Sequence, residues 1–289
     1  MTDAVTDHPP TRNPLFCGTA LAQRIERAET DLMSTSATAA RDHRGERTAF
    51  AIPIGGGTAT YAGPGSPFNK IAGLGFDGTP DDAALTEVER AFAERGAPVQ
   101  VELSTLADPE IGARLTARGY HLVSFENVLG RELTGGLDGA ATPGIEVERS
   151  SDAEFEAWLD IVVDAFAHPD TEGVPSHEEF PRQAIADAMR DVAAAGVVRY
   201  LARRDGVVAG GASARAAGGI AQLNGAATTP AHRRRGVQTA LLSARLADLA
   251  AAGCDVAVVT TQPGSRSQRN VQRHGFDLLY TRAVLTHEP

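Results

Sequence analysis

Residues 228–242 combine residue types and spacings that suit the binding of an anion. An apolar run at 221–228 is followed by Pro230, and a basic turn then leads through Gly236 into a helical pattern at 240–252. A strand that enters a helix through a glycine turn leaves backbone N–H groups unpaired at the helix N-terminus, where the helix dipole is positive. The segment therefore predicts a site for a phosphorylated ligand.

The three arginines of this turn, Arg233, Arg234 and Arg235, could instead be a solvent-exposed run of charge. That alternative is unfavourable, because each positive charge near the positive end of a helix dipole costs about 0.3–1 kcal/mol unless an anion compensates. We therefore prefer the anion site.

Length and composition limit the class of protein. The chain has 289 residues, of which 42% are hydrophobic and 22% charged, enough for two domains with their own cores. A formal net charge of −10 argues against nucleic acid or an anionic membrane as a partner. Cys17 and Cys254 are far apart and lack metal-ligand spacing, and no export signal or membrane-spanning run is apparent. We expect a cytoplasmic protein without a bound metal.

The chain contains an internal repeat. A loose junction rich in Gly and Thr at 134–144 separates two patterned halves, which predicts domains at 1–139 and 140–289. A single gapless shift matches apolar and glycine positions of the first half to the second: Leu85 to Leu241, Ala91 to Ala247, Thr105 to Thr261, Gly119 to Gly275, Tyr120 to Phe276, Leu122 to Leu278, Val128 to Val284 and Leu129 to Leu285.

Hydrophobic periodicity gives both halves the same order of elements. Helices are expected at 19–41, 81–95, 109–118, 152–167, 176–195, 239–252 and 265–274. Strands are expected at 48–54, 58–62, 70–74, 99–103, 144–149, 198–203, 207–215, 221–228 and 256–261, with further strands within 120–133 and a closing hairpin pair around 277–286. This order predicts an α/β fold in which each half forms a mixed, partly antiparallel sheet with helices on both faces.

The motifs of the second half resemble those of the GNAT superfamily of acyl-CoA N-acyltransferases. Thr228-x-Pro230 precedes Arg233-x-x-Gly236-x-Gln238, and a Gly-Phe corner follows at 275–276. The resemblance covers nearly all of the second half, and it reaches the first half through the repeat. It implies a tandem protein with two GNAT-like domains.

The same resemblance implies acyl-CoA, most simply acetyl-CoA, as co-substrate. Backbone N–H groups of residues 235–240 would hold the coenzyme A pyrophosphate, and the end of the preceding strand would pair with the pantetheine arm. Gln238 departs from the family's usual Gly or Ala, and Asn270 could be only an exposed helix residue. The cofactor-binding candidates are Ala227, Thr228, Arg233, Arg235, Gly236, Val237, Gln238, Thr239, Ala240, Ser267 and Asn270.

The first half lacks the basic loop. Its matching segment, 76–82, carries Asp77, Asp81 and Asp82 before the helix. Carboxylates at a helix N-terminus satisfy the dipole internally and would repel a pyrophosphate. We expect this half to be degenerate, without coenzyme A, and to have a structural role that could include one wall of the substrate site.

For catalysis, the resemblance implies direct attack of an amine on the thioester, with backbone N–H groups near Ala227 and Thr228 stabilising the oxyanion. The strand position where the family often has an acid is Asn224, and the slot of its usual tyrosine is Val271. Tyr280 is the nearest alternative hydroxyl, unless it is only a half-buried sheet residue. A thiol with a pKa of about 8.5 could also leave without a protein acid.

A polar segment at 168–181 lies where the family builds its acceptor site. His168, Asp170, Glu172 and Glu178 are candidates for holding a cationic acceptor or for acting as a base. A purely structural alternative is that Ser176 and Glu179 form a capping box at a helix N-terminus. The segment does not read His-Glu-x-x-His, so a zinc site is not expected.

These observations favour an N-acetyltransferase that acts on a small-molecule amine, with Tyr280, Glu178 and Asn224 as catalytic candidates. A non-catalytic acyl-CoA-binding or sensor protein is the alternative, because the usual acid and base positions are missing. An aminoacyl-tRNA-dependent transferase is disfavoured by the acidic charge balance. A homodimer is left open.

Overall fold

The computed structural model describes residues 13–133, 142–167, 172–174 and 177–289. The helices are α1 Thr19–Arg44, α2 Asp82–Ala93, α3 Pro109–Ala117, α4 Phe155–Ala167, α5 Arg182–Ala194, α6 Val237–Ala251 and α7 Arg266–Arg273. The strands are β1 Phe50–Ile54, β2 Gly57–Tyr61, β3 Lys70–Ala72, β4 Val99–Ser104, β5 His121–Glu132, β6 Ile145–Arg149, β7 Val198–Arg204, β8 Val207–Ala217, β9 Ile220–Thr228, β10 Val256–Thr261 and β11 Asp277–His287. Short 3-10 turns at Asp152–Glu154 and Pro230–His232 precede α4 and α6.

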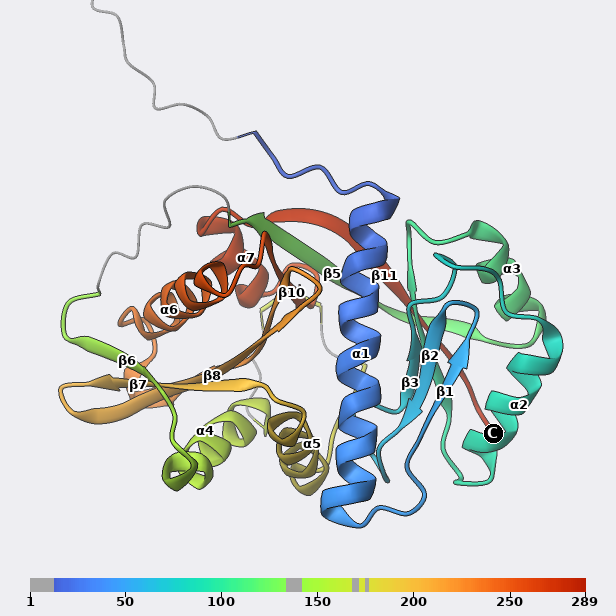
Figure 1. Ribbon diagram of the computed structural model, residues 1–289, viewed down its shortest axis with the longest axis horizontal. Coiled ribbons are helices and arrows are strands. Elements are labelled where there is room, and N and C mark those ends of the chain that lie inside the picture. Colours follow the sequence, from blue (N-terminus) through green and yellow to red (C-terminus); the bar gives the residue numbers. More distant parts are fainter. Residues whose placement is uncertain (1–12, 134–141, 168–171, 175–176) are drawn as a thin grey trace, which may run out of the picture.

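The described strands form one 11-stranded sheet in the order β1-β2-β3-β4-β11-β5-β10-β9-β8-β7-β6. The two halves exchange their last strands: β5 lies against β10 of the second half, and β11 lies against β4 of the first. The two exchanged strands also pair with each other. The mixed α/β class is therefore confirmed, but the expected pair of separate sheets is corrected to a single continuous one (Figure 1).

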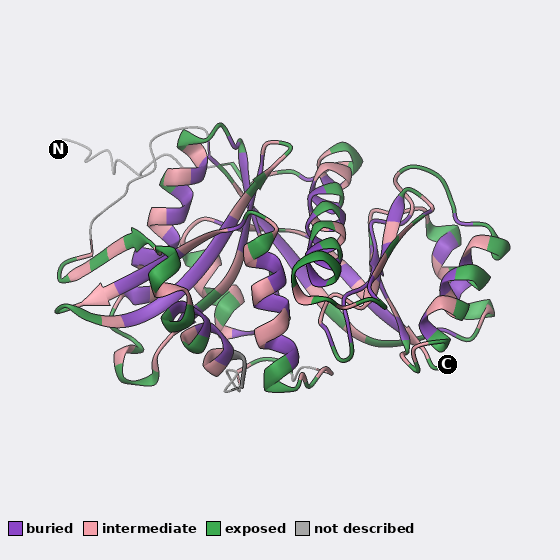
Figure 2. Cartoon of the chain, turned by 60° about the horizontal axis from the view of Figure 1, so that its bottom comes forward, coloured by how far each residue is buried: buried purple, intermediate pink, exposed green. Residues whose placement is uncertain are grey.

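Helices cover both faces of this sheet, as expected. The apolar sides of α2, α3 and α6 pack on one face, while α1, α4 and α5 pack on the other. Each of these six helices turns a buried side to the sheet and an exposed side to solvent (Figure 2). Trp158 of α4 is fully buried, and its indole Nε1 donates to the carbonyl of Ala212 at 3.0 Å.

Helix α1 lies across the centre of the molecule, between the strands of the two halves (Figure 1). It contacts β1, β2 and β3 of the first half as well as β9 and α5 of the second. Ala22, Ile25 and Ala28 of α1 pack on Val128 of β5 and Val258 of β10. The strands that α1 contacts therefore extend from β1, at one edge of the sheet, to β9, so this helix links strands of both halves.

Two local expectations are wrong. The residues around 277–286 form the single strand β11 rather than a hairpin, and irregularities near Tyr280 and Leu285 bend the strand instead of reversing it. The helix expected from 176 begins only at Arg182, after Pro181. Ser176 lies outside the described residues. A capping box does occur elsewhere, at Ser151 and Glu154 before α4.

In the described part of the chain, no helix is long and apolar enough to cross a membrane.

Candidate functional site

The parallel strands β9 and β10 separate at their carboxyl ends. Their register ends with Val258 opposite Gln222, although β9 continues to Thr228 and β10 to Thr261. We call the facing ends, residues 223–228 and 259–261, the strand opening. Backbone groups on these inner edges are available to a ligand that enters as an additional strand.

A bulge shapes the β9 side of the strand opening. Ser213 of β8 lies opposite Asn224, whereas Gly211 lies opposite Ala227, so β9 carries one extra residue here. Gly225 has a φ of 54°, in the left-handed region that glycine tolerates. The bulge thereby turns the backbone at 225–226 out of the regular ladder.

Arg245 of α6 stabilises this bulge through hydrogen bonds to β8 and β9. Its buried guanidinium donates from Nη1 to the carbonyls of Ser213 (3.1 Å) and Asn224 (3.4 Å), and from Nε to the carbonyl of Leu241 (3.1 Å). Burial lowers the pKa of Arg245 to about 10. The side chain therefore acts as a donor that holds the carbonyls of Ser213 and Asn224 at the bulge, while its bond to Leu241 fixes it against α6.

The basic turn forms the N-terminus of α6, directly after β9. Arg234 (φ 61°) and Gly236 (φ 84°) both adopt left-handed backbone, and Gly236 is the N-cap residue. No acidic residue lies in the first turn of α6, so the N–H groups of Val237, Gln238 and Thr239 are left for a ligand. The Thr228 hydroxyl donates to Gln238 Oε1 at 3.3 Å, which turns the Gln238 side chain toward the end of β9.

The matching helix of the first half, α2, has a different N-terminus. Asp81 is the N-cap of α2 and its side chain accepts from the Ala84 N–H at 2.8 Å, while Asp82 occupies the first turn. Two N-termini that correspond in the repeat are thus capped in the first half and open in the second. This is the difference that the sequence led us to expect at 76–82.

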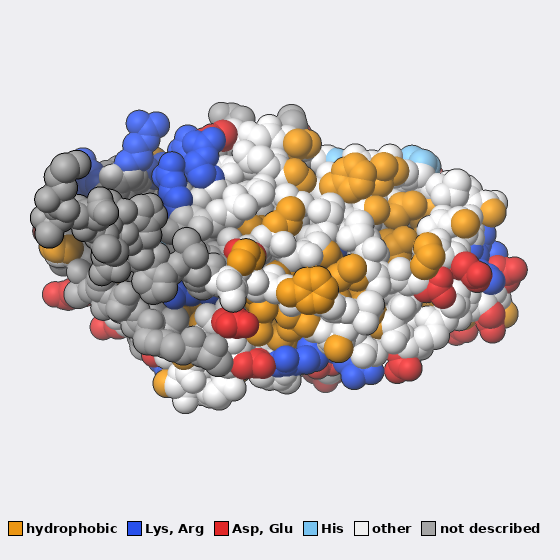
Figure 3. Space-filling view, turned by 90° about the horizontal axis from the view of Figure 1, so that it is seen from above, with side chains coloured by type: hydrophobic (Ala, Val, Ile, Leu, Met, Phe, Trp, Pro, Cys, Tyr) orange, Lys and Arg blue, Asp and Glu red, His pale blue; other side chains and the backbone are white. Residues whose placement is uncertain are grey.

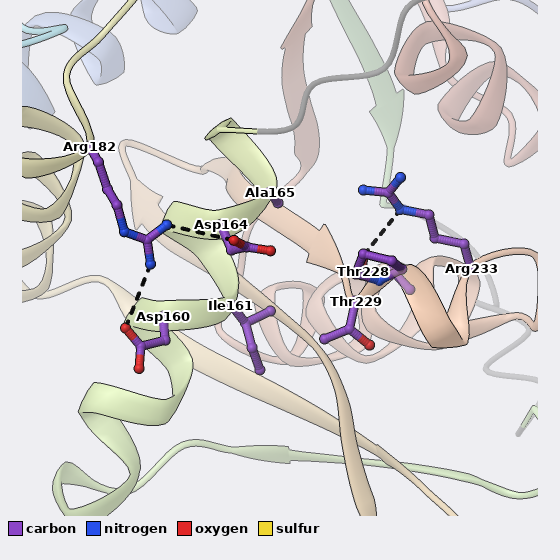
Figure 4. Close-up of a pocket in the computed structure, with 9 residues that line it drawn as sticks. Asp160, Ile161, Asp164, Ala165, Arg182, Thr228, Thr229 and Arg233 are labelled. Atoms are coloured by element: carbon purple, nitrogen blue, oxygen red, sulfur yellow. Dashed lines mark hydrogen bonds and ion pairs between the residues drawn. The ribbon is translucent and has the colours of Figure 1, made fainter.

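A hollow of about 260 Å³ opens beside the basic turn, on the α4 side of β9 (Figure 4). Arg182 of α5 lies within 3.9 Å of Asp160 and 3.6 Å of Asp164, both on α4. On the opposite wall, Arg233 turns back so that its Nε donates to the Thr228 carbonyl at 3.5 Å. The hollow is thus bordered by groups of both charges.

The described part of the segment between α4 and α5 contacts the residues that follow β10. Glu172 forms ion pairs with Arg266 (3.4 Å) and with Arg269 of α7. The Val174 N–H donates to the Pro263 carbonyl at 3.1 Å. A Cβ on Gly173 would lie 2.6 Å from the Ser265 nitrogen, so this contact requires glycine. Glu172 therefore serves as a clamp in this structure; His168 and Asp170 lie outside the described residues.

Charged side chains from both halves meet above the middle of the sheet. We call this group the central charge network; its members are Glu26, Glu29, Lys70, Glu102, Glu126, Tyr280 and Arg282. Arg282, 2% exposed, lies 2.9 Å from Glu26 and 3.2 Å from Glu102, and Lys70 lies 2.5 Å from Glu102. Burial opposes the charge on Glu102, but Lys70 and Arg282 hold its pKa below the usual range.

Tyr280 belongs to this network and not to the strand opening. Its hydroxyl donates to Glu26 Oε1 at 2.6 Å, and only 5% of the residue is exposed. Burial, with the charge of Glu26, raises the pKa of Tyr280 well above 10. A phenol engaged in this way is poorly placed to protonate a departing thiolate.

Sequence reasoning did not select Glu126, which is the member of the network that extends toward the strand opening. It lies on β5 opposite Arg282, with 3.9 Å between Oε2 and Arg282 Nη1. Glu178 lies near enough to act on it electrostatically, so the structure brings one catalytic candidate beside this carboxylate. The sequence contained a signal for this residue, because the shift that matches Val128 to Val284 also matches Glu126 to Arg282. Opposite charges at equivalent positions of two strands indicate an ion pair if those strands are neighbours.

Several buried polar atoms around the strand opening lack a hydrogen-bond partner among the described residues: Asn224 Nδ2, Thr261 Oγ1 and Gln262 Oε1. Thr261 is 6% exposed. Buried polar groups are usually satisfied, so atoms of this kind mark a place where a ligand would complete the bonding. Of the remaining candidates, Ala227 is buried on β9, Ala240 is buried on α6, Ser267 is exposed on α7 and Asn270 is half-buried there.

Among the described residues, no group of three or more His, Cys, Asp and Glu side chains is arranged to hold a metal ion.

Residues 155–276 match the model of the Acetyltransferase (GNAT) family. Among solved structures, a GCN5-related N-acetyltransferase from Kribbella flavida is 23% identical, with 88% of this chain and 95% of that chain covered and a TM-score of 0.61. A tandem GNAT protein from the clavulanic acid biosynthesis pathway is 12% identical, with 95% and 97% covered and a TM-score of 0.60. A GCN5-related N-acetyltransferase from Sphaerobacter thermophilus is 16% identical, with 71% and 67% covered and a TM-score of 0.54. No curated protein matches the chain.

Within the second half, residues 155–276 therefore match a GNAT acetyltransferase family domain. At these identities the solved structures show the fold alone, and they show it over both halves of the chain. The matched range begins at α4 and ends at Phe276, so it includes the strand opening, the basic turn and α7, but neither β5 nor β11.

Proposed function

We propose that the protein is an acyl-CoA-dependent N-acyltransferase that transfers an acetyl group from acetyl-CoA to an amine of a small molecule. The observation that carries this proposal is the uncapped N-terminus of α6 at the end of β9, beside the strand opening. An open helix N-terminus suits a pyrophosphate, and two separated parallel strands suit an amide-bearing arm.

In this arrangement, the N–H groups of residues 235–240 bind the pyrophosphate, and Arg233 and Arg235 supply positive charge near it. Arg side chains gather at the end of the molecule formed by the second half (Figure 3), and Arg233, Arg234 and Arg235 of that half are exposed, which supports binding of an anion there in spite of the acidic net charge. The pantetheine arm follows Ala227 and Thr228 into the strand opening, with Ser267 and Asn270 of α7 on its other side.

The thioester then lies at the β9 bulge. Backbone N–H groups near Ala227 stabilise the oxyanion that forms when the amine adds to the carbonyl. The unpartnered Nδ2 of Asn224 is a further donor at this level, and it cannot act as a base. The Asp81 cap supports the expectation that the first half binds no coenzyme.

Calorimetric titration with acetyl-CoA and measurement of free thiol in the presence of amines test this proposal together. We expect acetyl-CoA to bind with one site per chain and thiol release to depend on an amine. Binding without turnover on any amine would favour the non-catalytic sensor, and absence of binding would contradict both functions.

A further inference from the structure

The register of β5 places Glu126 beside the strand opening. Asn127 lies opposite Thr261 and Val128 lies opposite Thr260, so Glu126 lies one residue beyond the end of β10. Side chains alternate along a strand, and Glu126 therefore points to the same face as Val128, which packs beneath α1. Strand β10 lies between β5 and β9 and ends one residue short of this level, so the Glu126 carboxylate faces the β9 bulge across the end of β10, about two strand spacings of about 4.8 Å away.

Solvent reaches this face at the level of the strand opening. Thr260 is exposed even though β10 is a central strand of the sheet, and its side chain points to the α1 face like that of Val258. The side chain of Glu126 is 18% exposed, whereas those of Glu26 and Glu102 are almost completely buried. Among the network carboxylates, Glu29 on α1 is about as exposed as Glu126, and Glu126 is the exposed one that lies on a strand at the level of the strand opening.

Groups from four other elements surround Glu126: Glu102 on β4, Lys70 on β3, Arg282 on β11 and Glu178 on the segment before α5. Burial, with the negative charges of Glu102 and Glu178, raises the pKa of Glu126 to about 8, although Lys70 and Arg282 offset part of the shift. From α1, Glu29 accepts from Gln222 Nε2 at 3.4 Å, at the last paired residue of β9, and so connects the network to the strand opening.

From this geometry we infer that Glu126 is the general base of the proposed acyl transfer, supplied by the first half of the chain to the site of the second. The inference rests on the proposed function. Asn224 occupies the usual acid position and cannot take up a proton, and Tyr280 is bound to Glu26, so the exchanged strand provides the missing carboxylate.

The Glu126 carboxylate takes one proton from the substrate ammonium and leaves a neutral amine. The nitrogen lone pair then adds to the thioester carbon; the new C–N bond remains and the C–S bond breaks with its electron pair on sulfur. The second nitrogen proton passes through water to the coenzyme A thiolate, and Glu126 returns its proton to solvent. The net products are an amide, coenzyme A and one proton.

The variant Glu126→Gln tests this inference, with Glu132→Gln at the exposed end of the same strand as matched control and Glu178→Gln to test the other nearby carboxylate. The acceptor probes are spermidine and tyramine, which are protonated at neutral pH, and aniline, which is already neutral. In the wild-type protein we expect kcat/KM for the alkylamines to rise as the pH passes through about 8, because the base must be deprotonated.

In Glu126→Gln, kcat for the alkylamines should fall by about 100-fold to 10,000-fold, the range of general-base catalysis, and the rise near pH 8 should disappear. Turnover of aniline should fall by less than about 10-fold, since a neutral amine needs no prior deprotonation. Acetyl-CoA affinity should be unchanged. A merely structural role would reduce all three probes equally.

Equal losses for the alkylamines and aniline, or an unchanged pH profile in Glu126→Gln, would overturn the inference while the transferase function stands. Loss of the pH-dependent rise in Glu178→Gln but not in Glu126→Gln would also overturn it and assign the proton to Glu178. Wild-type protein that binds acetyl-CoA and turns over neither these three probes nor any other amine would overturn the transferase function, and the inference with it.

Discussion

At the scale of single residues, Gly236 determines whether the N-terminus of α6 can accept an anion. A Cβ at this position would lie 2.8 Å from Thr142 Cγ2, and the φ of 84° is unfavourable for any side chain. Gly78 in the first half has a similar φ of 97° with open space around it, so it is a control matched for backbone strain. The two glycines therefore separate loss of a ligand site from loss of a turn.

We predict that Gly236→Glu weakens acetyl-CoA binding by at least about 100-fold, which corresponds to about 2.8 kcal/mol, because a carboxylate would replace the ligand at the helix N-terminus. Gly78→Glu should leave the dissociation constant within about threefold. Titration calorimetry measures both. Equal losses in the two variants would contradict the assignment of one coenzyme site to the second half.

Arg245 is the residue that holds the β9 bulge, and its replacement should affect stability and binding together. Arg245→Met keeps much of the side-chain volume but leaves the carbonyls of Ser213 and Asn224 without this donor. We expect a loss of about 1–3 kcal/mol in the free energy of unfolding and weaker acetyl-CoA binding. Urea denaturation and calorimetry check this, with Arg190→Met, which removes a half-exposed side chain of α5, as control. Wild-type binding by Arg245→Met would show that the bulge does not need this support.

At the scale of elements, the clamp between the α4–α5 segment and α7 should control the acceptor rather than the coenzyme. Glu172→Gln removes the ion pairs with Arg266 and Arg269, each of which contributes about 0.2–1 kcal/mol at an exposed site. We expect KM for the amine to rise about threefold and acetyl-CoA affinity to stay constant. Glu179→Gln, also on this segment and exposed, should change neither quantity. A change confined to coenzyme binding would place the clamp in the other subsite.

The elements also show how far the sequence could be read. The order of helices and strands, the mixed α/β class and the open turn at Gly236 follow from local patterns of apolar residues, glycine and charge, and these patterns are visible without a structure. Strand partners are not local. Nothing in residues 121–132 or 277–287 specifies that each strand pairs within the other half, so the hairpin expected around Tyr280 was wrong and Glu126 went unselected.

At the scale of the whole molecule, strand exchange makes the two halves depend on each other. Without residues 140–289, β4 and β5 would each lose β11 as a neighbour, and β5 would also lose β10. Unpaired, largely apolar strand edges favour aggregation. The junction that divides the sequence is therefore not a line along which the sheet divides.

We predict that 1–139 and 140–289, produced as separate chains, are each unable to unfold cooperatively, whereas the two produced together form a complex that binds acetyl-CoA. Thermal denaturation of each piece and of the co-purified pair is the measurement, and the intact chain is the control. Independent folding and coenzyme binding by 140–289 alone would contradict this interdependence.

The pairing of Glu126 with Arg282 has a consequence for symmetry. The two residues occupy equivalent positions of the repeat and face each other across β5 and β11, so the axis that relates the halves passes between them. In a symmetrical dimer of one repeat, each residue at that position would face its own copy, and a carboxylate there would meet a second carboxylate. A single polypeptide removes this restriction, because its two halves can change independently. The centre of the molecule can then hold an acid on one side of the axis and a guanidinium on the other.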